Sequence, residues 1–238
     1  FPFPDGTFTH VIHAATDASA ALNQSAPRAM FDTCVEGTRR VLSLAQERGA
    51  TRLLFTSSGA VYGRQPPEVA HLPEDHRGGP DPLDPKNAYA EGKRAAEMLC
   101  SLAVDAGLAV TVARCFAFVG PHLPRDAHFA VGNFLRDALA GGPIRIAGDG
   151  TPYRSYLYAA DLVEWLVTIL LRGVAGRAYN VGSEEAVSIR DLASRVAGAA
   201  ASVWPERAVP GVVVARPPRP DATVERYVPS CARARAEL

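Results

Sequence analysis

The sequence has no surplus of charge of either sign and no long apolar run. Its 238 residues include 25 Lys plus Arg and 25 Asp plus Glu, so the formal net charge is zero, and we expect neither a basic face for nucleic acid nor an acidic tail. No apolar run approaches the roughly 20 residues that a membrane helix requires. No charged region followed by an apolar stretch marks a secretion signal. The sequence therefore predicts a cytoplasmic protein without nucleic-acid or membrane partners.

Cysteine is scarce, and its four copies are too far apart to form a CxxC pair. The six histidines are scattered as well, so the clustered ligands of a metal site are missing. Unpaired thiols in a reducing compartment explain this pattern, and no metal is expected. The cysteines are Cys34, Cys100, Cys115 and Cys231.

An initiator Met is also lacking. Residues 1–6 are rich in Pro and are typical of a loop that leads into a strand. We therefore expect a further N-terminal segment to precede these residues in the protein.

Apolar residues make up 47% of the sequence, enough for one α/β domain or for a domain with a smaller lobe. Three continuous apolar runs predict buried strands, and two amphipathic stretches that end at glycine predict helices. Such an alternation is typical of a parallel sheet covered on both faces. The expected strands are residues 11–15, 52–56 and 109–114, the expected helices are 25–48 and 88–105, and a surface loop is expected over 63–86.

Beyond Gly120 the segments become shorter and the turns more frequent. Helices are expected over 129–140, 160–171 and 188–200, with Ser188 as the N-cap of the last. We expect this part to form a smaller lobe over the carboxyl ends of the sheet strands.

Tyr89 and Lys93 are the residues that indicate chemistry. They are four positions apart in an expected helix, so they share one face. An ammonium near a phenol favours the phenolate and lowers the pKa of the tyrosine, which suits proton exchange with a sugar hydroxyl or carbonyl near neutral pH. Taken alone, such a pair is more often a surface lysine beside a half-buried tyrosine.

Three hydroxyl residues, Thr56, Ser57 and Ser58, stand at the carboxyl end of the second expected strand. Ligands bind at these ends in open parallel sheets, where a hydroxyl can hold a reacting oxygen against a tyrosine. Taken alone, the two serines would only cap the strand end. Together with Tyr89 and Lys93 they favour a catalytic site.

In their order along the chain, these segments resemble the extended short-chain dehydrogenase/reductase family of NAD-dependent sugar-nucleotide epimerases, dehydratases and reductases. The resemblance runs essentially from end to end, and the ordered set is far more specific than any one motif. It implies a Rossmann-like doubly wound parallel sheet, incomplete at its N-terminus, with a smaller α/β substrate-binding lobe. The matching segments are residues 11–15, Gly37-Thr38 with Val41-Leu42, residues 57–63 and 89–93, Gly148-Asp149-Gly150 with Arg154 and Asp161, and residues 179–182.

The same resemblance implies two domains and a cofactor, NAD or NADP. Residues 1–120 would form the dinucleotide-binding domain without its first βαβ units. Residues 121–238 would form mainly the substrate-binding lobe, with some segments returning to the sheet.

The resemblance also assigns roles to single residues. Tyr89 would be the acid/base, Lys93 would tune it and hold the nicotinamide ribose, and Ser58 would be the catalytic serine that also contacts substrate. Arg154 would bind the diphosphate of a nucleotide sugar, since a guanidinium suits phosphate oxygens; the alternative is a solvated turn arginine. The further residues expected to contact the cofactor are Ala14, Ala15, Thr16, Thr56 and Phe116.

The sequence departs from the family pattern in three places. The glycine-rich phosphate loop, which would precede Val11, is absent, and the residue that selects NAD over NADP would lie there too. Cys34 and Ala117 stand where the family usually has Asn, so two polar contacts are lost.

Gly59 and Ala60 are the third departure. The related 4,6-dehydratases carry Asp and Glu there and the related decarboxylases carry a Glu, although their "YDEGKR" resembles residues 89–94. Since Gly and Ala cannot transfer protons, the sequence disfavours dehydration and decarboxylation. It favours hydride transfer with Tyr89 as the proton donor or acceptor.

The resulting hypothesis is an NAD(P)-dependent enzyme that acts on a UDP-, dTDP-, GDP- or CDP-linked sugar, commonly at C4. It would be an epimerase or a 4-ketoreductase. The alternative is a non-catalytic NAD(P)-binding relative. By analogy with the family, a homodimer is expected through the helices over 25–48 and 88–105.

Overall fold

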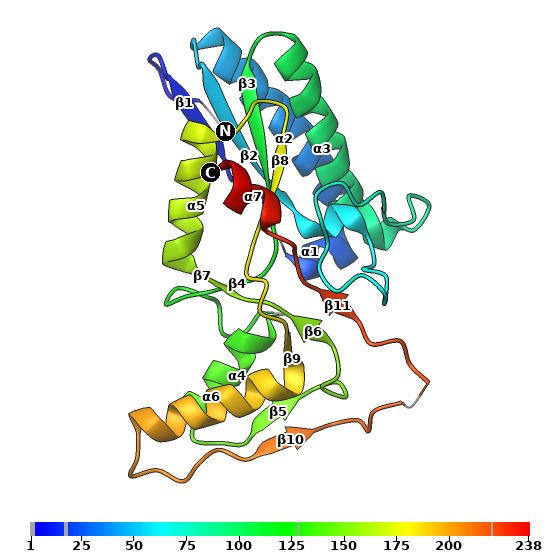
Figure 1. Cartoon of the computed structure of the whole chain (residues 1–238), viewed down its shortest axis with the longest axis vertical. Coiled ribbons are helices and arrows are strands. Elements are labelled where there is room, and N and C mark those ends of the chain that lie inside the picture. Colours follow the sequence, from blue (N-terminus) through cyan, green and yellow to red (C-terminus); the bar gives the residue numbers. More distant parts are fainter. Residues whose placement is uncertain (1–2, 17–18, 128, 220) are drawn as a thin grey trace.

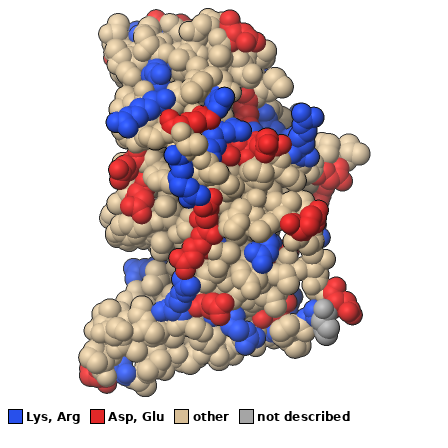
Figure 2. Space-filling model, viewed as in Figure 1, with Lys and Arg blue, Asp and Glu red and all other residues tan. Residues whose placement is uncertain are grey.

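The computed structural model describes residues 3–16, 19–127, 129–219 and 221–238. Phe1 and Pro2, the start of the expected N-terminal loop, lie outside the described residues. Within these ranges no helix has the length and apolar character to cross a bilayer. Figure 2 shows basic and acidic side chains interspersed over the visible face, in keeping with a net charge of zero.

The main sheet is parallel and lies between two layers of helices (Figure 1). It contains β1 (His10–His13), β2 (Arg52–Ser58), β3 (Ala109–Cys115) and β8 (Ala178–Val181), in the order β1-β2-β3-β8. One face is covered by α2 (Pro27–Glu47) and α3 (Ala88–Asp105), and the other by α5 (Ala159–Arg172).

Side chains alternate along β2 because successive residues of a strand point to opposite faces. Leu53 and Phe55 pack with α2 and α3, whereas Leu54 packs with α5. All three are at most 1% exposed, so β2 is buried on both faces. The predicted α/β class, a doubly wound parallel sheet, is confirmed.

The helix expected over 25–48 is shorter at both ends, and a separate short helix precedes it. A short helix, α1, spans Ala20–Ser25, and α2 begins at Pro27. Proline suits the first position of a helix, where its missing N–H is not needed and its φ is already helical, so the expected start at Ser25 was wrong. At the other end Gly49 takes a φ of 76°, the left-handed conformation that ends helices.

The smaller lobe has its own apolar core. In it, α4 (Ala130–Leu139) and α6 (Ile189–Val203) pack against β5 (Ile144–Ile146) and β10 (Val212–Val214), which form a parallel pair. Ser188 caps α6 as predicted, since its Oγ accepts the Asp191 N–H at 3.0 Å. Figure 1 shows the lobe beyond the carboxyl ends of the main-sheet strands.

Short elements connect the lobe with the main sheet. The final segment of the chain runs from the lobe back to the sheet and ends in α7 (Ala232–Glu237) (Figure 1). Ala234 of α7 belongs to the same apolar cluster as Ile169 and Leu170 of α5. Two 3₁₀ turns, η1 (Gly59–Tyr62) and η2 (Pro85–Asn87), lie before α3. The short strands are β4 (Phe118–Val119) with β7 (Leu157–Tyr158), and β6 (Tyr153–Arg154) between β9 (Val187–Ser188) and β11 (Arg226–Tyr227).

Candidate functional site

The three hydroxyls at the end of β2 have different partners. Thr56 Oγ1 donates to the His13 carbonyl at 3.0 Å, which joins β2 to β1. Ser57 Oγ donates to Glu97 Oε1 at 2.6 Å, on the side where Glu97 forms an ion pair with Arg114. Ser58 Oγ accepts the Ala60 N–H at 3.2 Å and so caps η1. Of the three, only Ser58 is among the groups that influence the pKa of Tyr89, the candidate catalytic tyrosine.

Lys93 is a buried cation, only 2% exposed. Its Nζ donates to Thr16 Oγ1 at 3.1 Å and to the Thr56 carbonyl at 2.8 Å. It also stands 4.8 Å from the Phe55 ring centroid and 5.9 Å from that of Tyr89. Because burial disfavours the charged form, the pKa of Lys93 is lowered.

The environment of Tyr89 corrects one expectation. Burial is the largest influence and raises the pKa of Tyr89, while hydrogen bonding with Ser58 lowers it in part. The sequence predicted that Lys93 would lower this pKa, but the lysine directs its ammonium to Thr16 and Thr56 instead. The phenol is therefore protonated over a wide pH range in the structure described here.

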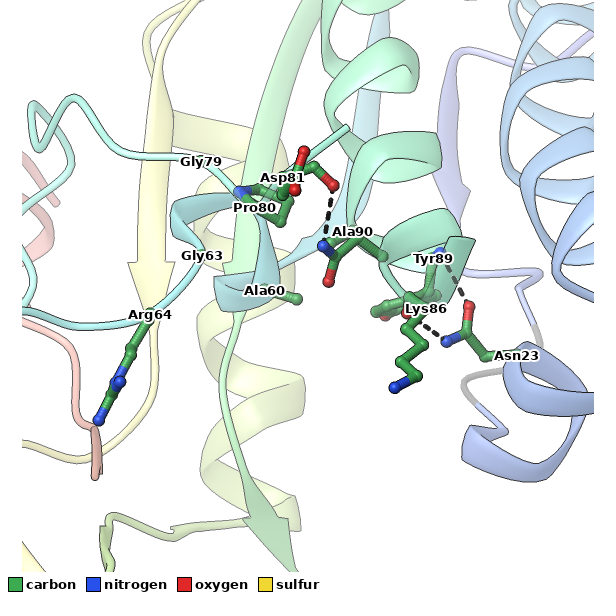
Figure 3. A pocket seen from close by; sticks show the side chains of 11 residues that line it. Asn23, Ala60, Gly63, Arg64, Gly79, Pro80, Asp81, Lys86, Tyr89 and Ala90 are labelled. Carbon is green, nitrogen blue, oxygen red and sulfur yellow. Dashed lines mark hydrogen bonds between the residues drawn. The ribbon is translucent and has the colours of Figure 1, made fainter. Parts of the chain in front are cut away.

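Tyr89 is positioned by a residue that the sequence did not point to. Asn23 Oδ1 accepts the backbone N–H of Tyr89 at 3.0 Å, and its Nδ2 donates to the Lys86 carbonyl at 2.7 Å. Figure 3 shows both bonds reaching from α1 to the start of α3. No sequence motif around Asn23 signalled this contact, which joins segments 66 residues apart.

A cavity of about 500 Å³ opens in front of Tyr89. In Figure 3, Arg64 lies on one side of it and Lys86 on the other, with Ala60 between them. Two cations at the rim suit an anionic ligand. The other residues that line the cavity are Asn23, Gly63, Gly79, Pro80, Asp81, Asn87 and Ala90.

The residues expected to contact a nicotinamide cofactor lie at the ends of β1 and β2. Ala14 and Ala15 are exposed directly after β1, where small side chains leave the backbone open to a ligand. Thr16 lies at Lys93 Nζ, and the register of β1 on β2 places His13 beside Phe55. These residues fit the nicotinamide-ribose end of a dinucleotide.

Phe116, the remaining expected cofactor contact, is only 8% exposed and lies over the turn after Ser58. A Cβ atom added to Gly59 would stand 2.8 Å from Phe116 Cζ and 2.7 Å from Tyr227 Oη. The two rings are 4.6 Å apart between centroids. Tyr227 was not predicted as a site residue, because β11 has only two residues and carries no motif.

Arg154 lies on β6, next to β11. Its Nη1 donates to the Tyr153 carbonyl at 2.9 Å, and its Nη2 is 3.5 Å from the exposed carboxylate of Glu225, a weak surface pair. The register of β11 on β6 places Arg154 beside Tyr227. Binding of a diphosphate by Arg154 stays a prediction.

The two positions that lack the family's Asn have structural contacts of their own. Cys34 is 1% exposed and packs where α2 meets α3, since a Cβ on Gly92 would stand 2.8 Å from Cys34 Cβ. The Ala117 carbonyl accepts the Leu157 N–H at 3.0 Å.

All four cysteines are free thiols. Across the described ranges, no group of three or more His, Cys, Asp or Glu is arranged to hold a metal ion.

Comparison with known proteins identifies the family. Residues 3–182 match the NAD dependent epimerase/dehydratase family, and the chain belongs to it. It is 34% identical over 193 residues to UDP-glucuronic acid decarboxylase 1 of Danio rerio, covering 81% of this chain and 45% of that protein. It is 33% identical over 187 residues to UDP-glucuronic acid decarboxylase 3 of Arabidopsis thaliana, covering 78% of this chain and 54% of that protein.

Solved structures share the fold. RMD from Pseudomonas aeruginosa, complexed with NADPH, superposes with a TM-score of 0.81 at 27% identity, over 96% of this chain and 74% of that one. UDP-glucose 4-epimerase from Thermotoga maritima, with UDP-glucose, superposes with a TM-score of 0.78 at 24% identity, over 96% of this chain and 70% of that one. The chain spans about half the length of the decarboxylases it matches. The extended family predicted from the sequence is confirmed.

Proposed function

We propose that the protein is an NAD(P)-dependent enzyme that transfers hydride at a carbon of a nucleotide-activated sugar, commonly C4, as an epimerase or a 4-ketoreductase. The observation that carries this proposal is the position of buried Lys93, which stands 5.9 Å from the Tyr89 ring centroid and donates to the Thr56 carbonyl at 2.8 Å, at the end of β2 that carries Ser58. A phenol and a hydroxyl held together at the end of a parallel strand can bind one oxygen of a substrate and exchange a proton with it.

Each residue then has a role in the reaction. As the phenolate, Tyr89 accepts the proton of the sugar hydroxyl when that carbon is oxidised, and as the phenol it returns the proton when the ketone is reduced. Ser58 hydrogen-bonds the same oxygen, and Arg154 binds the diphosphate. Lys93 holds the ribose, with Ala14, Ala15, Thr16, Thr56 and Phe116 around the nicotinamide. The cofactor, when bound, supplies the hydride acceptor and donor.

Gly59 supports epimerisation or ketoreduction over decarboxylation. A side chain at this position would require Tyr227 and Phe116 to move. The turn itself, Gly59–Tyr62, carries no carboxylate. Decarboxylation of a nucleotide-linked uronic acid is the second candidate, because relatives at 33–35% identity are UDP-glucuronic acid decarboxylases. Release of CO₂ from UDP-glucuronic acid by the full-length protein would establish the second candidate.

Replacing Tyr89 with Phe tests the proposal. We expect the Tyr89→Phe variant to fold normally and to lose turnover by at least about a hundredfold, the scale of a lost general acid/base. Exchange of label at the sugar carbon and conversion of UDP- and dTDP-sugars are the measurements. Unchanged activity in this variant would contradict the proposed mechanism and favour a non-catalytic binding protein.

The cofactor content separates the two leading activities. Denaturing the purified full-length protein and assaying the supernatant should release near-stoichiometric NAD from an epimerase, which reuses its cofactor within each cycle. A ketoreductase exchanges its cofactor, so it should release little and should oxidise NAD(P)H with a 4-keto-6-deoxy nucleotide sugar.

A further inference from the structure

Two side chains of α3 are bonded to the end of β2. Lys93 Nζ donates to the Thr56 carbonyl at 2.8 Å, and Glu97 Oε1 accepts the hydroxyl of Ser57 at 2.6 Å. Glu97 follows Lys93 by four residues, so the two side chains lie on one face of the helix. Two successive residues of β2 are thus tied to two successive turns of α3, immediately before Ser58.

Arg114 on β3 fixes the orientation of Glu97. The register of β2 on β3 places Arg114 beside Ser57. Its Nε and Nη2 donate to the two carboxylate oxygens of Glu97 at 3.0 and 2.7 Å, a bidentate pair in which the side chains are only 18% and 16% exposed. Its Nη1 donates to Tyr62 Oη at 2.9 Å. The carboxylate is therefore held in place to accept the Ser57 hydroxyl.

The turn after Ser58 is held by the same helix. The pairing of β2 with β3 ends at Ser58 and Cys115, so η1 lies beyond the ladder. Arg94 Nη1 donates to the carbonyl of Val61 in η1 at 2.9 Å, and to the carbonyl of Gly78 in the long loop at 2.9 Å. Bonds from α3 therefore stand on both sides of Ser58 along the chain.

These bonds supply what the apolar packing of α3 on the sheet lacks. Ala96 and Cys100 of α3 pack in one cluster with Phe55 of β2. Apolar contact is non-directional and permits a helix to shift along a strand, whereas hydrogen bonds require a defined distance and angle. Because Tyr89 lies in the first turn of α3, the bonded side chains set where its ring stands relative to Ser58.

We propose that Arg94 and Glu97 are positioning residues for the reaction: Glu97 holds the residue before Ser58, Arg94 holds the turn after it, and together they keep the Ser58 hydroxyl in register with Tyr89. The proposal rests on the proposed roles of Ser58 and Tyr89. A misplacement of about 1 Å can lower a rate by about a hundredfold, so neither residue needs to contact the substrate to affect turnover.

Two variants release the two sides separately. Ser57→Ala removes the bond to Glu97 and leaves the Glu97–Arg114 pair intact. Arg94→Met keeps the length of the stem and removes the donors to both carbonyls. We expect each to lower kcat about tenfold, and Ser57→Ala to leave KM for the nucleotide sugar within about threefold. If Ser57→Ala proves unstable, Arg94→Met still tests the proposal, because its side chain is 43% exposed.

Matched controls make the same chemical changes elsewhere. Ser101→Ala removes an exposed hydroxyl one turn beyond Glu97 on α3. Arg195→Met removes an exposed guanidinium that pairs with Glu185 in the smaller lobe. Both should keep the kcat of the wild type. Equal melting temperatures of controls and test variants would show that all of them fold.

Amide exchange tests the positioning without turnover. Ser58 Oγ accepts the Ala60 N–H at 3.2 Å, so the exchange rate of this amide reports whether the Ser58 hydroxyl keeps its place. In the full-length protein, Ser57→Ala and Arg94→Met should raise this rate toward that of Ser58→Ala. The bonded N–H of Val112 in β3 should exchange as in the wild type.

The outcomes separate this proposal from the proposed function. Faster exchange at Ala60 in a protein that turns over no nucleotide sugar would retain the positioning role and reject the proposed function. Wild-type exchange at Ala60 in both variants would overturn the positioning role, whatever their kcat.

A double variant tests whether the effect passes through Ser58. If it does, adding Ser57→Ala to Ser58→Ala should lower the remaining kcat by less than about twofold, since coupled residues are not additive. A further loss of about tenfold in that background would mean that Ser57 and Glu97 act by another route, and would overturn the proposal.

Discussion

His13 and Lys93 are two buried nitrogen bases that both pack against the Phe55 ring. Burial and then the charge of Lys93 lower the pKa of His13 to about 4. Thr38 Oγ1 donates its proton to the Cys34 carbonyl at 2.7 Å, so it can only accept from His13 Nε2 at 3.0 Å. This places the proton of the neutral ring on Nε2.

His13 should make the protein less stable in mild acid. Its pKa is about 4 in the folded protein and about 6.5 unfolded, so the unfolded chain binds more protons between these values and stability is lost as pH falls from 6.5 toward 4. Because of His13, the unfolding free energy of the wild type should fall by up to about 2 kcal/mol between pH 7 and pH 5. The His13→Gln variant should not show this fall. Urea titrations at both pH values measure this.

The control for that titration is His10→Gln, which replaces an exposed histidine at the start of the same strand. It should keep the pH dependence of the wild type. An identical pH dependence in His13→Gln and the wild type would contradict the buried neutral ring.

Among the helices, α3 begins without a cap of its own. Its N-cap residue, Asn87, makes no side-chain bond to the first turn, and the N–H of Tyr89 is instead accepted by Asn23 from α1. A catalytic side chain in the first turn of a helix moves with that turn. The capping bond from α1 therefore bears directly on where the phenol of Tyr89 stands.

Removing this cap should affect stability and activity together. We expect Asn23→Ala to lower the unfolding free energy by about 1 kcal/mol, as for other lost caps, and to lower kcat. Asn23→Asp keeps the acceptor for the Tyr89 N–H and should retain more of both. Chemical denaturation and the sugar-nucleotide assay are the measurements; full activity in Asn23→Ala would show that α3 holds Tyr89 without help.

Sequence patterns could predict the long elements but not the short ones. Apolar runs predicted the bounds of β2 and β3 to within two residues, and the amphipathic stretch before Gly107 predicted α3. These elements are long enough for burial to impose a regular spacing of apolar residues along the sequence. Strands of two residues, such as β6 and β11, are too short to show any period. They form because the segments that pair with them are held nearby.

The same limit applies to the site. Ser58, Tyr89 and Lys93 were predictable because the motif residues lie within two short segments. Asn23 and Tyr227 reach the site from distant parts of the chain, where only tertiary packing brings them close.

On the scale of the whole molecule, Asn180 joins parts that are far apart in the sequence. It is fully buried on β8, and its Oδ1 accepts the Tyr62 hydroxyl at 2.7 Å. Its Nδ2 donates to the carbonyls of Leu72 at 2.8 Å and Ser230 at 3.1 Å. One amide thus connects the sheet, the turn after Ser58, the long loop and the final segment.

Losing this amide should destabilise the whole fold. We expect Asn180→Ala to lower the unfolding free energy by about 3 kcal/mol, since three buried partners lose a hydrogen bond worth about 1 kcal/mol each. Urea denaturation measures it. Gln46→Ala, an exposed position on α2, should change stability by less than about 0.5 kcal/mol. Equal midpoints for Asn180→Ala and the wild type would mean that water replaces the lost bonds.

The basic residues of this protein are almost all arginine, and the sequence contains only two lysines, Lys86 and Lys93. Both lie at the same site: Lys86 is exposed at the rim of the cavity, and Lys93 is buried behind Tyr89. A reagent that acylates side-chain amines therefore reacts with Lys86 at the rim of the cavity, whereas buried Lys93 is shielded from it. Mass spectrometry of Lys86 would then report, by its protection, any molecule that fills the space in front of Tyr89.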